Sequence, residues 1–219
     1  MEKGQLIEFR LQGERRLAVL DRPEGKKDWI ALDQRGHPHK IKPQQVEYQV
    51  QGGPYTTKEI PSFIEAAENN QDQSDSLEIA WEIQVQEGKG ITPADLAMLL
   101  FSETSPLYCY IAHSLLMEDR IYFKRKGELY EARPANQVEE IKHQLEVERL
   151  KQEEKEAFVS KLKLAQAKEK VEWNEGDRSR LETLERYVLH SEESSRAAHE
   201  ILTLAGKPTT AEAAHELIV

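Results

Sequence analysis

The 219-residue sequence contains one cysteine, Cys109, and no apolar run long enough to cross a membrane. A single cysteine excludes a framework of internal disulfides. The opening residues, MEKGQLIEF, lack the basic start and the apolar core of a secretion signal. From these absences we expect no contact with a membrane, and we expect the protein to work in the cytoplasm.

Positive charge is also scarce. Thirty Lys and Arg residues stand against 40 Asp and Glu, which gives a net charge of −10 and argues against bulk attraction to nucleic acid. The charge is uneven, however. Residues 1–55 hold 10 basic and 8 acidic side chains, residues 120–135 hold 5 and 2, and residues 56–119 hold 2 and 12. Contact with RNA is therefore expected only locally, through residues 1–55 and 120–135.

Residues 1–53 have the pattern of a small β-barrel. Short apolar segments, separated by glycine and proline turns, predict about five strands. These segments are residues 5–11, 16–20, 29–32, 39–41 and 46–50. The following Gln51-Gly52-Gly53-Pro54 is typical of a linker.

Residues 57–134 are predicted to form a winged-helix domain with preceding helices. Apolar spacing predicts helices over 57–71 and 76–87, with a polar break at 69–75. Two further helices are predicted to start at Thr92-Pro93 and at Ser105-Pro106, where a capping residue precedes a proline at the first helical position.

A β-hairpin is predicted directly after these helices. Residues 120–125 alternate like a strand, Lys126-Gly127 forms a turn, and residues 128–132 form the second strand. Helices followed by a hairpin is the order of a winged helix.

A long polar helix is predicted over residues 135–172. It has apolar side chains near both ends and nothing to bury around 151–156. A helix that is polar all round in its middle is typical of a bridge between two modules. A two-stranded coiled coil, which would make the protein an oligomer, is the alternative, although the heptad lapses in the middle.

Residues 173–219 are predicted to form a helical module, with helices starting at Asp177, at Ser194 or Ser195, and after Thr210. The apolar ending Leu217-Ile218-Val219 is unlike a natural terminus, which is usually polar and frayed. We therefore expect the sequence to be one part of a longer polypeptide. The predicted fold class is α+β and mostly helical.

No arrangement of residues in the sequence indicates catalysis. Cys109 lies among apolar residues and is expected to be a small buried hydrophobe. The pairs Glu140/His143 and Glu212/His215 have a spacing that metal-binding helical bundles use, but such bundles need carboxylates from two further helices. We predict no catalytic residue, no metal site and no cofactor in this chain.

The helix predicted over residues 105–117 would read bases if this winged helix bound DNA. Its sequence, SPLYCYIAHSLLM, holds no Arg, Lys, Asn or Gln, the side chains that recognise base edges. No DNA base readout is therefore expected.

The hairpin beside that helix has the composition of a surface that binds single-stranded RNA, since its basic side chains suit phosphates and its aromatic side chain suits stacking. The candidates there are Arg120, Tyr122, Lys124, Arg125 and Lys126. In the barrel the candidates are Arg10, Arg15 and Arg16. The alternative is that the apolar hairpin residues belong to the core while the basic ones only keep the hairpin soluble.

The segment TPADLAMLLF at 92–101, followed by Ser105-Pro106 and the strand residues 121–124, resembles the helix-turn-helix part of RNase II/RNase R family proteins. The similar branch is that of photosynthetic bacteria and plastids. The segments KGQLIEFR at 3–10 and DRPEGKK at 21–27, and the ending from Gly206 to Val219, resemble the same branch. The resemblance covers most of the chain.

This resemblance implies a processive 3′-to-5′ exoribonuclease that uses magnesium, with this chain as its non-catalytic N-terminal region. The aspartate cluster that holds the metal in that family has no matching positions here, so catalysis would belong to a domain C-terminal to this chain. The chain would then guide or gate single-stranded RNA for that domain. The alternative is a protein-interaction scaffold that uses the winged helix and the long helix and binds no RNA.

Overall fold

A computed structural model describes residues 1–70, 76–190 and 195–218 of the protein. The chain divides into two compact units, Met1–Glu139 and Glu140–Val219. The first unit contains all the strands described below together with four helices, and the second is helical. The predicted α+β class, mostly helical, is confirmed.

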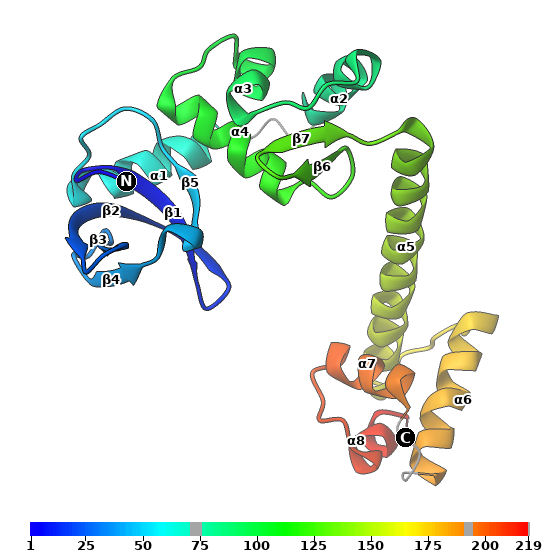
Figure 1. The fold of residues 1–219 in the computed structure, drawn as a ribbon. Helices are drawn as coiled ribbons and strands as arrows, with labels where there is room; N and C mark the ends of the chain where they lie inside the picture. The colour runs from blue at the N-terminus through cyan, green and yellow to red at the C-terminus, as the bar shows by residue number, and fades with distance from the viewer. Residues whose placement is uncertain (71–75, 191–194, 219) are drawn as a thin grey trace. The chain divides into compact units, whose positions relative to one another are not determined.

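The first unit begins with a five-stranded antiparallel sheet in the spatial order β4-β3-β2-β1-β5 (Figure 1). Its strands are β1 (Leu6–Leu11), β2 (Glu14–Glu24), β3 (Asp28–Leu32), β4 (Pro38–Ile41) and β5 (Val46–Gln49). Gln12 and Gly13, both with positive φ, join β1 to β2 in a two-residue turn, the geometry that matches the twist of a hairpin. The five predicted strands are confirmed.

Strand β1 is buried on both faces. Because successive side chains of a strand point to opposite sides, Ile7 and Phe9 enter one apolar cluster while Leu6 enters another. The second cluster includes Ile60, the first residue of helix α1 (Ile60–Asn69). Glu8 lies on the same side as Leu6 and is also fully buried. A charged side chain thus sits where the barrel packs against helices.

Helix α1 is shorter than predicted. Residues Thr57–Glu59 form a 3-10 turn, and the Glu59 carboxylate accepts the backbone N–H of Thr56 at 2.7 Å. Helix α1 then runs to Asn69. The end of the helix predicted at residue 71 and most of the polar break lie outside the described residues.

The winged-helix part consists of α2 (Ser76–Glu87), α3 (Pro93–Phe101), α4 (Pro106–Glu118), β6 (Phe123–Lys126) and β7 (Leu129–Ala132). The predicted cap of α3 is confirmed, because the Thr92 hydroxyl accepts the Asp95 N–H while the Asp95 carboxylate accepts the Thr92 N–H. Ser102 ends α3 in a left-handed conformation. Helices α3 and α4 pack closely, and the hairpin β6–β7 follows them.

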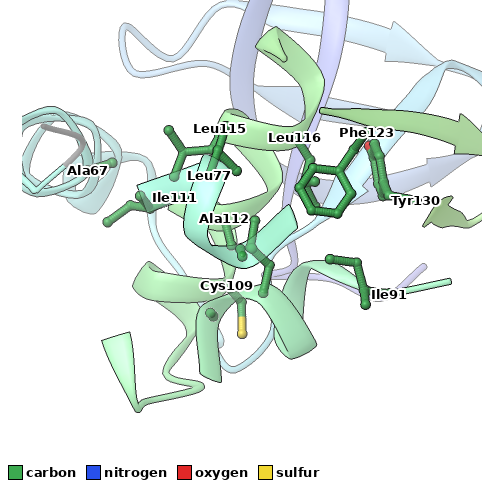
Figure 2. Close-up of a cluster of buried hydrophobic side chains, with 13 residues drawn as sticks. Ala67, Leu77, Ile91, Cys109, Ile111, Ala112, Leu115, Leu116, Phe123 and Tyr130 are labelled. Atoms are coloured by element: carbon green, nitrogen blue, oxygen red, sulfur yellow. The ribbon is translucent and has the colours of Figure 1, made fainter. Parts of the chain in front are cut away.

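One apolar core holds the winged-helix part together, and Figure 2 shows its side chains converging from the helices and the hairpin. Helix α4 supplies Cys109, Ile111, Ala112, Leu115 and Leu116. Cys109 is buried as predicted, its Sγ lies 3.4 Å from the Thr104 carbonyl oxygen, and burial raises the pKa of its thiol.

The second unit contains most of the long helix α5 (Ala135–Gln166) together with α6 (Glu175–Leu189), α7 (Arg196–Leu204) and α8 (Ala211–Ile218). Phe158, Val159 and Leu162 of α5 are buried against the later helices. The Lys161 ammonium lies 2.6 Å from the carboxylate of buried Asp177, which ties α5 to α6. In the middle of α5, Leu145 and Leu150 are exposed.

Two helix boundaries of the second unit differ from the prediction. Helix α5 stops at Gln166 because Lys168 adopts a left-handed conformation and the N–H of Glu169 bonds to the carbonyl of Leu164, a C-cap that usually carries glycine. Helix α6 starts at Glu175, not at Asp177, because Asn174 caps it through the Asp177 N–H. Of the two serines predicted to start α7, Ser195 caps it, and Ser194 lies outside the described residues.

Candidate nucleic-acid interface

The hairpin of the winged helix, β6–β7 with the preceding turn, is the first candidate surface. The predicted strand over 120–125 is wrong at its start, since β6 begins at Phe123. The Asp119 carboxylate accepts the backbone N–H groups of Ile121, Tyr122 and Phe123, at 2.9, 3.1 and 2.6 Å. This side chain holds residues 119–122 in a turn and places Arg120 outside the strand.

The two faces of the hairpin differ in character. Phe123 and its cross-strand partner Ala132 turn toward the core, as does Tyr130. Arg125, the cross-strand partner of Tyr130, lies on the same side of the hairpin. Lys124 and Lys126 occupy the opposite, exposed face. We call this exposed face, with its two lysines, the wing surface.

Two of the predicted RNA-binding cations of the hairpin, Lys126 and Arg125, also contact other groups of the protein. The Lys126 ammonium lies 2.9 Å from the Glu131 carboxylate at an exposed position, a type of pair that contributes little to stability. The Arg125 guanidinium donates to the Gly127 carbonyl at 3.2 Å and also contacts the Met117 sulfur. Both cations remain exposed.

Tyr122, the predicted stacking residue, lies beside the core. Its ring centroid is 5.8 Å from that of Trp81, and the tyrosine is half-buried. The Trp81 indole N–H donates to the Arg133 carbonyl at 2.7 Å, which fixes the indole against the base of the hairpin. Part of the Tyr122 side chain is therefore covered by the protein.

The three barrel arginines have different surroundings. Arg10 pairs with Glu47 at 2.8 Å, and Arg16 pairs with Glu14 at 3.1 Å, both near the surface. Arg15 instead reaches into the interior. Because Arg15 is turned away from solvent, we expect Arg10 and Arg16, and not Arg15, to be able to contact RNA.

Arg15 belongs to a polar cluster between the barrel and α4. Its guanidinium donates to Glu8 and to the Ser114 hydroxyl, both at 2.8 Å, and to Glu118 at 2.9 Å. The Glu8 carboxylate also accepts the Tyr110 hydroxyl at 2.8 Å and faces His113 Nε2 at 3.0 Å. Every polar neighbour of Glu8 in this group is thus a hydrogen-bond donor.

The cluster determines the ionisation of Glu8. Burial alone would raise the pKa of this carboxyl, but the hydrogen bonds from His113 and Arg15 and the charge of Arg15 outweigh burial and lower the pKa from 4.5 to about 2. Burial and the adjacent Glu8 charge raise the pKa of the Tyr110 phenol. Glu8 is therefore a carboxylate held inside the protein by donors.

Sequence reasoning did not find this cluster. The available signals were a glutamate inside the apolar strand LIEF and a histidine inside the apolar helix SPLYCYIAHSLLM. A charged or titratable residue on an apolar face calls for a buried partner. Since Glu8 and His113 are 105 positions apart, no local pattern could pair them.

The cluster also explains what covers α4. One face of the helix lies in the winged-helix core, and the side chains of Tyr110, His113 and Ser114 face the barrel. The Tyr48 ring of β5 stacks on the His113 ring at 4.2 Å. Helix α4 is therefore buried by contacts on two sides.

No metal or membrane element emerges from the described structure. Within residues 1–70, 76–190 and 195–218, no group of three or more His, Cys, Asp or Glu side chains is arranged to hold a metal ion. None of the helices in the same ranges combines the length and apolar character needed to cross a bilayer.

Comparison with known proteins places three family domains in succession along the chain. Residues 1–60 match the CSD-like barrel domain of RNase II, residues 62–137 the ribonuclease II winged helix domain, and residues 138–219 the double HTH domain of RNase II. No solved structure matches the chain.

Two curated relatives match over the whole chain. An uncharacterized ribonuclease of Synechocystis sp. is 55% identical, and ribonuclease II, chloroplastic/mitochondrial, of Arabidopsis thaliana is 34% identical. The chain spans only 33% and 29% of their lengths. With its barrel, winged-helix and double HTH domains, the chain belongs to the RNase II family and corresponds to its N-terminal region.

Proposed function

We propose that this chain guides single-stranded RNA toward a catalytic domain of the same polypeptide, and that the wing surface is its main RNA contact. The observation that carries this proposal is the exposure of Lys124 and Lys126 on one face of the hairpin, with Arg120 and Arg125 close by in sequence. Residues 120–135 are net positive within a protein of net charge −10. The positive charge of this region would attract RNA phosphates, whereas the net negative charge of the rest of the protein would repel them.

The mode of binding follows from what surrounds α4. Its residues are taken up by the core and the barrel, so we propose that the winged helix holds RNA by phosphate contacts and not by reading bases in a groove. Such contacts suit a guide, because they tolerate any sequence. We also expect this winged helix not to read the bases of DNA.

The activity of the whole protein is also a proposal. The relatives are named ribonucleases and are about three times as long as this chain. We propose that magnesium-dependent 3′-to-5′ hydrolysis belongs to parts of such a protein that the chain does not span. The cytoplasm remains the proposed compartment, although the plant relative is named chloroplastic/mitochondrial.

Binding of a fluorescent single-stranded RNA tests the wing surface. We expect Lys124→Glu/Arg125→Glu/Lys126→Glu to weaken binding and to reduce the salt dependence, by a slope of about 0.7 for each lost phosphate contact. A matched control, Lys163→Glu/Lys168→Glu/Lys170→Glu in the second unit, makes the same charge change at exposed positions. We expect it to bind nearly as well as the parent.

Two results would count against the wing. Unchanged binding by the hairpin variant would remove it as the contact, and an equal loss in both variants would mean that only net charge matters. Because three glutamates could disturb the hairpin, Lys124→Gln/Lys126→Gln serves as a milder variant, for which we expect a smaller loss in the same direction.

A further inference from the structure

We propose that a cleft between the barrel and helices α1 and α4 binds one nucleotide of single-stranded RNA, at a site separate from the wing surface. The inference rests on the proposed function, since it takes RNA to be the ligand of the first unit. It adds a second contact, one that would receive the base as well as the phosphate.

The cleft has a suitable size and floor. It encloses about 550 Å³, within the roughly 300–1,000 Å³ of ligand pockets. The partly exposed Ile64 of α1 supplies apolar surface, and the nearly fully buried Leu17 and Ile60 and the ring of Tyr110 also line the space. A nucleobase is flat and largely apolar on its faces, so it would cover this floor while its sugar and phosphate stay near the opening.

Two arginines of the barrel stand at the cleft. Arg16 is 41% exposed and pairs with the exposed Glu14. Arg35 is exposed in the turn between β3 and β4 and lines the cleft as well. A phosphate between these two side chains would exchange a weak surface pair for charge-assisted hydrogen bonds.

The turn that carries Arg35 is held in place. The Asp33 carboxylate accepts the backbone N–H groups of Arg35 and His37 at 2.8 and 2.9 Å, and it faces His39 Nε2 at 3.1 Å. Across the cleft, the bonds of Arg15 to Ser114 and Glu118 fix the wall formed by α4. A preformed wall on both sides lowers the entropy lost when a ligand binds.

The carboxylates of the cleft set its selectivity. Glu14 and Glu118 pair with arginines, and Asp33 is taken up by the turn. Glu68 lies exposed on α1 and can accept an N–H from a base. Guanine presents two adjacent N–H donors, N1–H and its amino group, whereas uracil presents N3–H alone. The cleft would therefore favour guanine over uracil.

Nuclear magnetic resonance of the 219-residue protein tests this site with guanosine and uridine 5′-monophosphates as probes. We expect guanosine monophosphate to shift the amide signals of Gln34, Arg35, Ile64 and Glu68. Because uridine monophosphate makes one hydrogen bond fewer to the carboxylate, we expect it to bind about tenfold more weakly than guanosine monophosphate. Glu68→Gln should reduce that difference and leave the shifts at Arg35.

Matched charge variants complete the test. Arg16→Glu/Arg35→Glu should abolish the shifts of Ile64 and Glu68, whereas Lys26→Glu/Lys27→Glu, an equal charge change on the β2–β3 turn, should keep them. Arg35→Gln, at an exposed position, is a variant that the fold should tolerate, and it should weaken binding.

The outcome separates the two proposals. If single-stranded RNA shifts only wing signals and neither monophosphate shifts the cleft, the cleft proposal is overturned while the wing stands. Cleft shifts that persist in the wing triple variant would support the cleft even if the wing contact fails. If neither region responds to RNA or to the monophosphates, both proposals are wrong.

Discussion

Glu8 of strand β1 and His113 of helix α4 meet inside the first unit, with Glu8 Oε1 3.0 Å from His113 Nε2 and both side chains almost fully buried. Glu8 is also the carboxylate to which Arg15 and Tyr110 donate. A buried charge is tolerated only where partners replace water. The barrel and the winged helix are therefore joined by a specific polar contact in addition to apolar packing.

Replacing Glu8 should destabilise the first unit. Glu8→Gln keeps the size of the side chain but removes the charge that Arg15 and His113 face. We expect the free energy of unfolding to fall by about 3 kcal/mol, the scale of a broken buried ion pair. Urea denaturation followed by tryptophan fluorescence measures it. Glu14→Gln, which removes an exposed partner of Arg16, should change the stability by less than about 0.5 kcal/mol.

The same carboxylate predicts a pH dependence. The pKa of Glu8 is about 2 in the folded protein, against 4.5 ordinarily, so its stabilising effect is complete above pH 4.5 and is lost as the pH falls from there toward 2. Asp33, whose pKa is lowered to about 2 by hydrogen bonds from His39 and two backbone N–H groups against the opposing effect of burial, adds to the loss.

The pH prediction is checked by denaturation at a series of pH values. The difference in stability between the parent and Glu8→Gln should be constant from pH 7 to about 5 and should shrink below pH 4.5. A difference that stays constant down to pH 3 would show that the charge of Glu8 contributes little.

A glycine at position 168 should stabilise the second unit. Lys168 ends α5 with φ +61°, a left-handed conformation that costs a residue with a side chain about 1 kcal/mol. Lys168→Gly relieves this strain but increases the conformational entropy of the unfolded chain. We therefore expect the free energy of unfolding, measured by thermal denaturation, to rise by about 0.5 kcal/mol. Lys170→Gly, two residues beyond the cap, should give no gain.

Local signals predicted the elements better than their ends or contacts. The starts of α3 and α4 were recognisable because a proline in the first helical turn is a local signal. The predicted side-chain cap forms only at Thr92 of α3, since Ser105 makes no such hydrogen bond at α4. The end of α5 was not, because Lys168 takes a place where glycine is the usual sign. The start of β6 was missed since the Asp119 carboxylate, and not residue periodicity, shapes the turn before it.

The candidate site was predictable only in part. The exposed lysines of the hairpin follow from composition and alternation along a strand. Arg15 and Arg16 are adjacent and have nearly the same sequence neighbours. In the fold, however, Arg15 points inward to Glu8 and Arg16 stays at the surface. That choice depends on α4, about a hundred residues away, and no local pattern encodes it.

The middle of α5 predicts how the protein behaves at high concentration. Leu145 and Leu150 are 41% and 46% exposed, which would suit a coiled coil if both faced one partner. At 3.6 residues per turn, five positions place them about 140° apart around the helix. They cannot share a seam. We therefore expect α5 not to form a dimer, and light scattering should give the mass of one 25.2 kDa chain at rising concentration. A dimer that Leu145→Glu dissociates, while the exposed control Gln144→Glu does not, would contradict this expectation.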